Sequence, residues 1–184
     1  MFRLAETAGP AAVIETERLR LRGHGTADFA DCMALWSDPL VYRYITGKPG
    51  KDGEVWGRIL RYVGHWAALG WGYWAVEEKA SGQLVGEVGF ADHKREIEPP
   101  LTGMPELGWV IASAHHAKGY GTEAVGAALA WSDLRFGARS ICCIAAPENT
   151  PSLRLAAKFG FREVLHTTYL GDPTILSIRE APNR

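Results

Sequence analysis

The residues best suited to chemistry lie between Glu106 and Gly121. The run from Glu106 to Ile111 is typical of a strand, a short loop follows, and Gly119-Tyr120-Gly121 opens a helix. Glycines let a backbone approach a ligand closely, and the first N–H groups of a helix lack partners within it. The loop holds two histidines and a lysine and no acid. This stretch therefore predicts an anion site suited to phosphates.

Two known phosphate-binding patterns fit this stretch less well. The P-loop requires Lys-Ser/Thr after its last glycine, which is absent here. The dinucleotide pattern G-x-G-x-x-G/A is matched by Gly119, Gly121 and Ala124, but a seven-residue loop separates it from the preceding strand. Arg139 and Ser140 stand about 20 residues on, where that pattern expects a ribose-binding acid. An NAD(P)-dependent oxidoreductase is therefore only an alternative.

A third pattern fits better and extends along the chain. The run 116–121, HAKGYG, resembles the Q/R-x-x-G-x-G/A pyrophosphate loop of the GNAT acetyltransferases, which bind acetyl-coenzyme A. The run 106–111 resembles the fourth strand of that family, and 149–161 resembles its later helix and the turn after it. The runs 17–22 and 119–124 resemble its ribosomal-protein N-acetyltransferase branch. Together the likeness covers about residues 14–168 in the order of the family.

The resemblance implies a fold and a set of cofactor contacts. The fold is α+β (mixed α/β), with a mostly antiparallel sheet that splays between its fourth and fifth strands and is flanked by helices. We expect a single domain at residues 14–184, after a flexible leader at 1–13. The predicted acetyl-coenzyme A contacts are Trp109, Val110 and Ile111 through their backbone, His116, Ala117, Lys118, Gly119, Tyr120, Gly121 and Thr122 at the diphosphate, Asn149 and Ser152 near the thioester, and Lys158 at an outer phosphate.

The resemblance also implies direct acetyl transfer to a primary amine, either a protein N-terminus or a small molecule. An amine with a pKa of about 8 to 10 is mostly charged at neutral pH, so a base must take its proton. We predict Glu106 as that base, because it begins the strand that would carry the reacting carbonyl, and Glu87 as a second candidate. Ser152 is the predicted hydrogen-bond donor to the departing sulfur.

Two positions depart from the family pattern. His116 stands where Gln or Arg is usual, so one diphosphate contact must come from an imidazole or from backbone. Ala156 stands where many members carry a general-acid tyrosine. The missing tyrosine leaves a second alternative, a module that binds acyl-coenzyme A as a sensor without catalysis.

Composition limits the kinds of molecule that this protein is expected to bind. The chain has 184 residues, 47% of them hydrophobic, and a net charge of −1, so no global basic field exists to hold nucleic acid or an anionic membrane. No apolar stretch approaches the roughly 18 residues of a membrane span. Cys32, Cys142 and Cys143 predict buried free thiols and a cytoplasmic protein. No Cys/His spacing suggests a metal site. The sequence leaves open a monomer or a homodimer.

The remaining elements must position these residues. We expect strands at 18–22, 71–76, 84–90, 140–145, 161–168 and 175–179. Helices are expected at 26–36, 54–69, 122–136 and from Thr150, which we predict as the N-cap, to the left-handed Gly160. An acceptor would enter over the early helices and the loop 94–103, where aromatic residues are numerous. Most of those aromatics are expected to be core.

Overall fold

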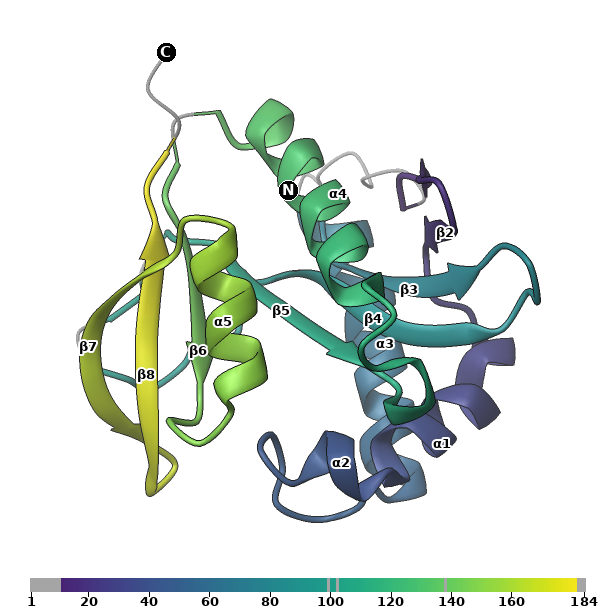
Figure 1. The fold of residues 1–184 in the computed structure, drawn as a ribbon, viewed down its shortest axis with the longest axis horizontal. Helices are drawn as coiled ribbons and strands as arrows, with labels where there is room; N and C mark the ends of the chain where they lie inside the picture. The colour runs from purple at the N-terminus through teal and green to yellow at the C-terminus, as the bar shows by residue number, and fades with distance from the viewer. Residues whose placement is uncertain (1–10, 99, 102, 138, 182–184) are drawn as a thin grey trace, which may run out of the picture.

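In a computed structural model, described for residues 11–98, 100–101, 103–137 and 139–181, one sheet runs through the whole molecule (Figure 1). Its eight strands lie in the order β1-β2-β3-β4-β5-β6-β8-β7. The strands are β1 (Ile14–Glu15), β2 (Leu19–Arg22), β3 (Tyr73–Glu78), β4 (Leu84–Ala91), β5 (Glu106–Ile111), β6 (Ile141–Ala145), β7 (Arg162–Tyr169) and β8 (Asp172–Arg179). The helices are α1 (Phe29–Ser37), α2 (Pro39–Tyr42), α3 (Asp52–Leu69), α4 (Tyr120–Arg135) and α5 (Thr150–Lys158), with 3-10 turns at Thr26–Asp28 and Ser113–His115.

The sheet is antiparallel except where β5 meets β6. On its other side β5 pairs with β4 along its whole length, from Gly86↔Ile111 to Ala91↔Glu106. Against β6 it keeps one registered pair, Glu106↔Cys142. The two strands therefore separate beyond Glu106, and the rest of β5 has a free backbone edge toward β6. The predicted α+β fold and its splay are confirmed.

Helices cover both faces of the sheet, and the alternation of side chains along β5 explains how. Successive residues of a strand point to opposite faces. Leu107 joins the core under α4, whereas Val110 joins a second cluster with α1 and α3. α4 packs on β2, β4 and β5, and α5 packs on β6 (Figure 1). The two faces of β5 thus open toward different surroundings.

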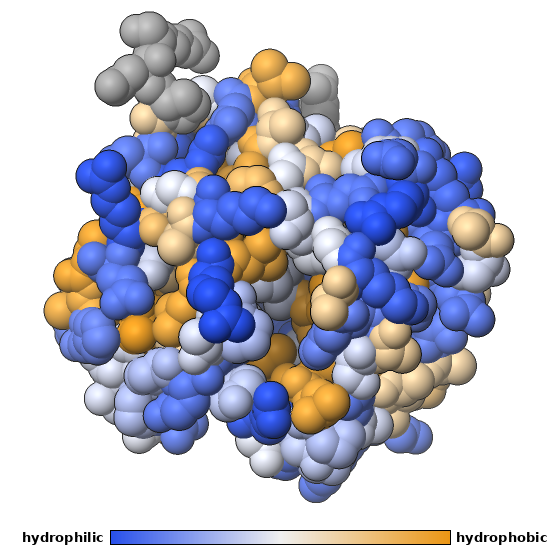
Figure 2. All heavy atoms as spheres, viewed as in Figure 1, coloured by the Kyte–Doolittle hydropathy of each residue, from blue (hydrophilic) through white to orange (hydrophobic). Residues whose placement is uncertain are grey.

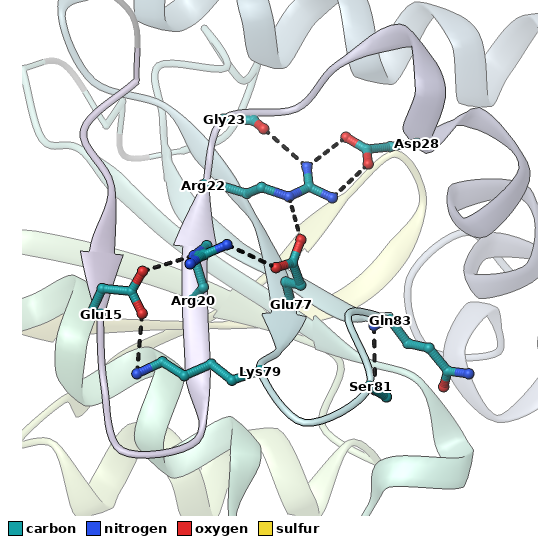
Figure 3. Close-up of polar contacts among 9 residues, drawn as sticks. All are labelled: Glu15, Arg20, Arg22, Gly23, Asp28, Glu77, Lys79, Ser81 and Gln83. Carbon is teal, nitrogen blue, oxygen red and sulfur yellow. Dashed lines mark hydrogen bonds and ion pairs between the residues drawn. The ribbon is translucent and has the colours of Figure 1, made fainter.

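The first strands carry a network of charged side chains (Figure 3). Glu77 accepts hydrogen bonds from Arg20 at 3.4 Å and from Arg22 at 2.8 Å. Arg22 also holds Asp28 through two hydrogen bonds of 2.9 and 2.8 Å. This network ties β2 and β3 to the entry of α1.

The N-terminal segment is partly docked where it is described. The carbonyl of Ala12 accepts a 2.7 Å hydrogen bond from Trp74 Nε1, and Ala11 packs against the core. The short strand β1, directly after the predicted leader, pairs with β2. Residues 1–10 of the predicted leader lie outside the described residues.

Two local predictions are corrected and a third is confirmed. β3 begins at Tyr73 rather than Trp71, because Trp71 turns aside and packs its ring edge-on to Phe136 at 5.5 Å. Thr150 is not the N-cap of α5, because Asn149 takes that place and accepts from the Ser152 amide at 3.3 Å. The three cysteines are buried and free, as predicted.

Candidate active site

Two cavities open where β5 and β6 separate, and they meet there. The first has a volume of about 500 Å³ and the second about 530 Å³. Figure 2 shows the surface hollowed near the centre of this face. The residues that line both cavities are Tyr44, Ile45, Trp109, Val110, Asn149 and Ser152. A molecule in one cavity can therefore touch a molecule in the other at this shared wall.

The start of α4 forms one wall of the first cavity. Gly119 is the N-cap residue, and its φ of 83° lies in the left-handed region that glycine adopts readily. Ala117 has a φ of 59°, which is costly for a residue with a side chain. The turn aims the unpaired amides of Tyr120, Gly121 and Thr122 outward, since the first N–H groups of an α-helix lack internal partners. This is the geometry of an anion site.

The side chain of Arg18, just before β2, holds that turn in place. Arg18 donates to the carbonyl of Lys118 at 2.9 Å and forms a 2.7 Å ion pair with Glu123. Its guanidinium also lies 4.6 Å from the centre of the Tyr120 ring, and Tyr120 donates to Glu78. Two motifs more than 100 residues apart, at 17–22 and 119–124, therefore contact each other. Their shared task is to position the loop.

The electrostatics of the first cavity favour an anion. Among the described residues that line it none is acidic, whereas Arg43, Arg154, His115 and His116 are present. Arg43 and Arg154 were not foreseen as site residues. Helical spacing would have indicated Arg154, because it lies one turn after Pro151 on the face of α5 that also presents Leu155.

His116 makes a contact that the family pattern does not suggest. Its Nε2 lies 2.8 Å from the carbonyl oxygen of Ile111. Because a carbonyl can only accept, Nε2 carries the proton and donates. The imidazole thus joins the loop to the end of β5.

Most predicted cofactor contacts lie together. The first cavity is lined by Trp109, Val110, Ile111, His116, Ala117, Gly119, Tyr120, Gly121, Thr122, Asn149 and Ser152. Lys118 and Lys158 line neither cavity. Lys158 is exposed at the opposite end of α5 from Asn149. Ala156 is 4% exposed and belongs to the core, so a methyl group fills the place of the tyrosine.

Glu106 lies in the wall of the second cavity and is 6% exposed. Both of its oxygens accept from Arg95, at 2.6 Å each. Burial alone would lower the pKa of Arg95, but the hydrogen bonds that it donates to Glu106 raise it above its usual range. Arg95 therefore carries its positive charge.

Glu87 lies elsewhere, fully buried and outside the lining of both cavities. Its carboxylate accepts from Trp36 Nε1 at 3.2 Å and from the Tyr62 hydroxyl at 3.0 Å. Burial would raise the pKa of Glu87, but His24, at 3.5 Å, the charge of Arg58 and the hydrogen bond from Tyr62 lower it. A reacting amine cannot reach it, so its place argues against the second candidate base.

Glu87 also gathers two further groups that are distant in sequence. The possible ligand atoms of His24, Cys32 and Glu87 all lie within 4.8 Å of one another. Burial raises the pKa of Cys32, so the thiol stays protonated and donates to Glu87 at 3.5 Å. In this core cluster Cys32 hydrogen-bonds to Glu87, whereas neither ring nitrogen of His24 has a hydrogen-bond partner among the described residues. The prediction of no metal site stays a prediction.

Comparison with known proteins gives the family. Residues 18–162 match the model of the acetyltransferase (GNAT) domain, so the chain belongs to the GNAT acetyltransferases and is an acyltransferase. The family uses acetyl-coenzyme A. This finding sets aside both the dinucleotide oxidoreductase and the sensor without catalysis.

Individual relatives agree with the family. The chain is 30% identical to a Bordetella pertussis protein described as a GNAT-family acetyltransferase, with a TM-score of 0.80 over 91% of this chain and 99% of that one. It is 29% identical to the uncharacterised protein YkkB of Bacillus subtilis over 79% of this chain and 82% of that protein. A Vibrio cholerae structure described as a ribosomal-protein-serine acetyltransferase has a TM-score of 0.73 at 21% identity, covering 93% of this chain and 98% of that one, and shows the fold alone.

Among the described residues, no helix is both long enough and apolar enough to cross a membrane.

Proposed function

We propose that this protein transfers an acetyl group directly from acetyl-coenzyme A to a primary amine in a ternary complex. The observation that carries this proposal is the meeting of two cavities at the splay of β5 and β6. One holds helix amides and basic side chains, and the other holds a buried carboxylate. A diphosphate suits the first and an amine suits the second.

The proposed roles follow from these positions. The amides at the turn of Ala117 to Thr122 hold the diphosphate, and the free edge of β5 at Trp109 to Ile111 pairs with the pantetheine arm. Asn149 is occupied as a helix cap, so it shapes the wall, while Ser152 offers a hydroxyl at the junction of the cavities. The side chains of Lys118 and Lys158 line neither cavity, so any effect of their charges on the phosphates acts at longer range.

Glu106 takes the proton of the attacking amine, directly or through a water. The neutral amine nitrogen then forms a bond to the thioester carbonyl carbon, and the C–S bond breaks with its electron pair left on sulfur as a thiolate. The second proton that the nitrogen loses passes to that thiolate, which leaves as the free thiol. A backbone N–H of β5 stabilises the oxyanion that forms in between. Ser152 donates to the sulfur or orders a water there.

The test measures release of the free thiol from acetyl-coenzyme A with a panel of amines and N-terminal peptides as acceptors. Calorimetry measures the binding of acetyl-coenzyme A separately. The proposal expects binding together with amine-dependent thiol release. Stoichiometric binding without acetyl transfer to any amine would contradict it. The panel also separates protein N-termini from small amines.

A further inference from the structure

The second cavity carries an excess of fixed positive charge, and this inference about its occupant rests on the proposed function. Arg58 and Arg61 lie one turn apart on α3, and Arg95 follows β4. The described acids in the wall are Glu106 and Asp172. The partners of each charge show which of them are available to an acceptor.

The charges of Arg95 and Glu106 cancel each other. The two hydrogen bonds of 2.6 Å between them form a bidentate pair in which the guanidinium and carboxylate planes match. The guanidinium of Arg95 also lies 4.7 Å from the centre of the Tyr169 ring. Arg95 is thus held in place and offers little to a second anion.

Arg58 has the charge that is available. Its guanidinium stacks 3.6 Å from the centre of the Trp36 indole, and one N–H donates to the Tyr62 hydroxyl at 3.3 Å. Among the described residues it makes no ion pair with a carboxylate within 4.0 Å. A guanidinium has five N–H donors in a planar fork that matches a carboxylate. Stacking fixes this fork at the cavity wall, so its remaining donors need a partner.

Two further acids bear on Arg58: against the effect of burial, the charge of Glu87 raises the pKa of Arg58 without a direct ion pair, and Asp172 lines the same cavity. Glu87 lies behind Tyr62, which donates to it at 3.0 Å, and Glu87 is fully buried. Asp172 is exposed at the start of β8, across the splay from α3. A di- or polycationic acceptor would therefore meet three arginines in this wall, with Asp172 as the one described carboxylate outside the Arg95–Glu106 pair.

The state of His93 reports the same positive field. His93 lines this cavity, and burial together with the charges of Arg95 and Arg61 lowers its pKa to about 3. The imidazole is neutral at pH 7, so its 3.9 Å approach to Glu106 is no ion pair. The charges of Arg95 and Arg61 thus act on His93 in addition to its burial.

We propose that the acceptor is an amine that also carries a carboxylate, and that this carboxylate pairs with Arg58. Arg61, exposed at the rim of the cavity, assists entry and adds a second positive charge. The amine then faces Glu106 and the shared wall with the first cavity. Arg58 is thereby the residue that sets acceptor specificity.

The test compares acceptor pairs that differ in one group, such as β-alanine with β-alaninamide and γ-aminobutyrate with its amide, with spermidine as a polycation. Thiol release gives kcat/KM, corrected to the fraction of neutral amine. We expect the wild type to prefer the carboxylate about tenfold or more, as a charged hydrogen bond implies. Arg58→Gln should abolish this preference, and Arg58→Lys should keep part of it.

The matched control is Arg162→Gln, because Arg162 is exposed on β7 and lines neither cavity. It should keep the wild-type preference. Equal use of carboxylate and amide, preference for spermidine, or a preference that survives Arg58→Gln would overturn this inference. If no acceptor is acetylated, calorimetry measures the affinity of the same acceptor pairs for the protein–coenzyme A complex. The preference for the carboxylate and its loss in Arg58→Gln are then judged from these affinities. Failure to bind acetyl-coenzyme A would instead contradict the proposed function.

Discussion

Replacing Glu106 by glutamine tests the proposed base with almost no change of shape. The amide oxygen can still accept from Arg95, but the negative charge and the proton acceptor are lost. Glu106 lies in the second cavity and outside the lining of the first. We therefore expect unchanged affinity for acetyl-coenzyme A and a large fall in kcat.

The size of both effects follows from the site. A positioned general base contributes about 10²- to 10⁴-fold, so kcat should fall at least about a hundredfold. The side chains of Glu106 and Arg95 are 8% and 18% exposed, so the variant also leaves a largely buried cation without its charged partner. This should cost about 1–3 kcal/mol, less than for a fully buried pair, and lower Tm by about 3–10 °C.

The assay is thiol release at saturating acetyl-coenzyme A, together with thermal unfolding. Arg95→Gln is the matched control, because it breaks the same ion pair and keeps the carboxylate. It should lose similar stability but retain most of the rate at pH 8. A Glu106→Gln enzyme within threefold of wild type, or equal rate losses in both variants, would refute a role for Glu106 as base.

Three further predictions follow from other parts of the molecule. A Cβ at Gly121 would lie 3.4 Å from Leu155, which is an ordinary contact, so the control variant Gly121→Gln should fold. In calorimetry, Gly121→Glu should bind acetyl-coenzyme A about a hundredfold more weakly than Gly121→Gln, because its negative charge would lie at the diphosphate. Equal affinities of the two variants would contradict the diphosphate site. Burial raises the pKa of Cys142 to about 12, so the native protein should react slowly with a chromogenic disulfide reagent at pH 8. The unfolded protein should react fully. Immediate reaction of the native thiols would contradict this burial. Burial opposes ionisation of Asp28, but the hydrogen bonds from Arg22 lower its pKa, so its stabilisation is complete above about pH 4 and lost as pH falls through the native value. In denaturant titrations Asp28→Asn should therefore cost about 1–2 kcal/mol at pH 6 and little near pH 2; an equal cost at both would contradict the linkage.

Local patterns in the sequence predicted most of the fold. The apolar run at 106–111 coincides with β5, and Gly70 and Gly160 end the elements before them with φ of 72° and 82°. Such signals are set by neighbours along the chain, so one sequence carries them. Thr150 was misjudged because its neighbour Asn149 is an equally good cap.

Contacts between distant residues were beyond local reasoning. The Arg58–Trp36 stack, the Arg95–Glu106 pair and the cluster around Glu87 each join different elements. No periodicity or spacing encodes such pairs, because only the tertiary fold brings them together. The sequence motifs therefore located the cofactor side of the site better than the acceptor side.

The most direct test of the central claim is a crystal structure of the protein with bound coenzyme A. The account predicts the diphosphate at the amides of residues 117–122 and the pantetheine arm along the free edge of β5, with its sulfur at the wall shared by the two cavities. A diphosphate bound elsewhere, or a sulfur that points away from that wall, would contradict it.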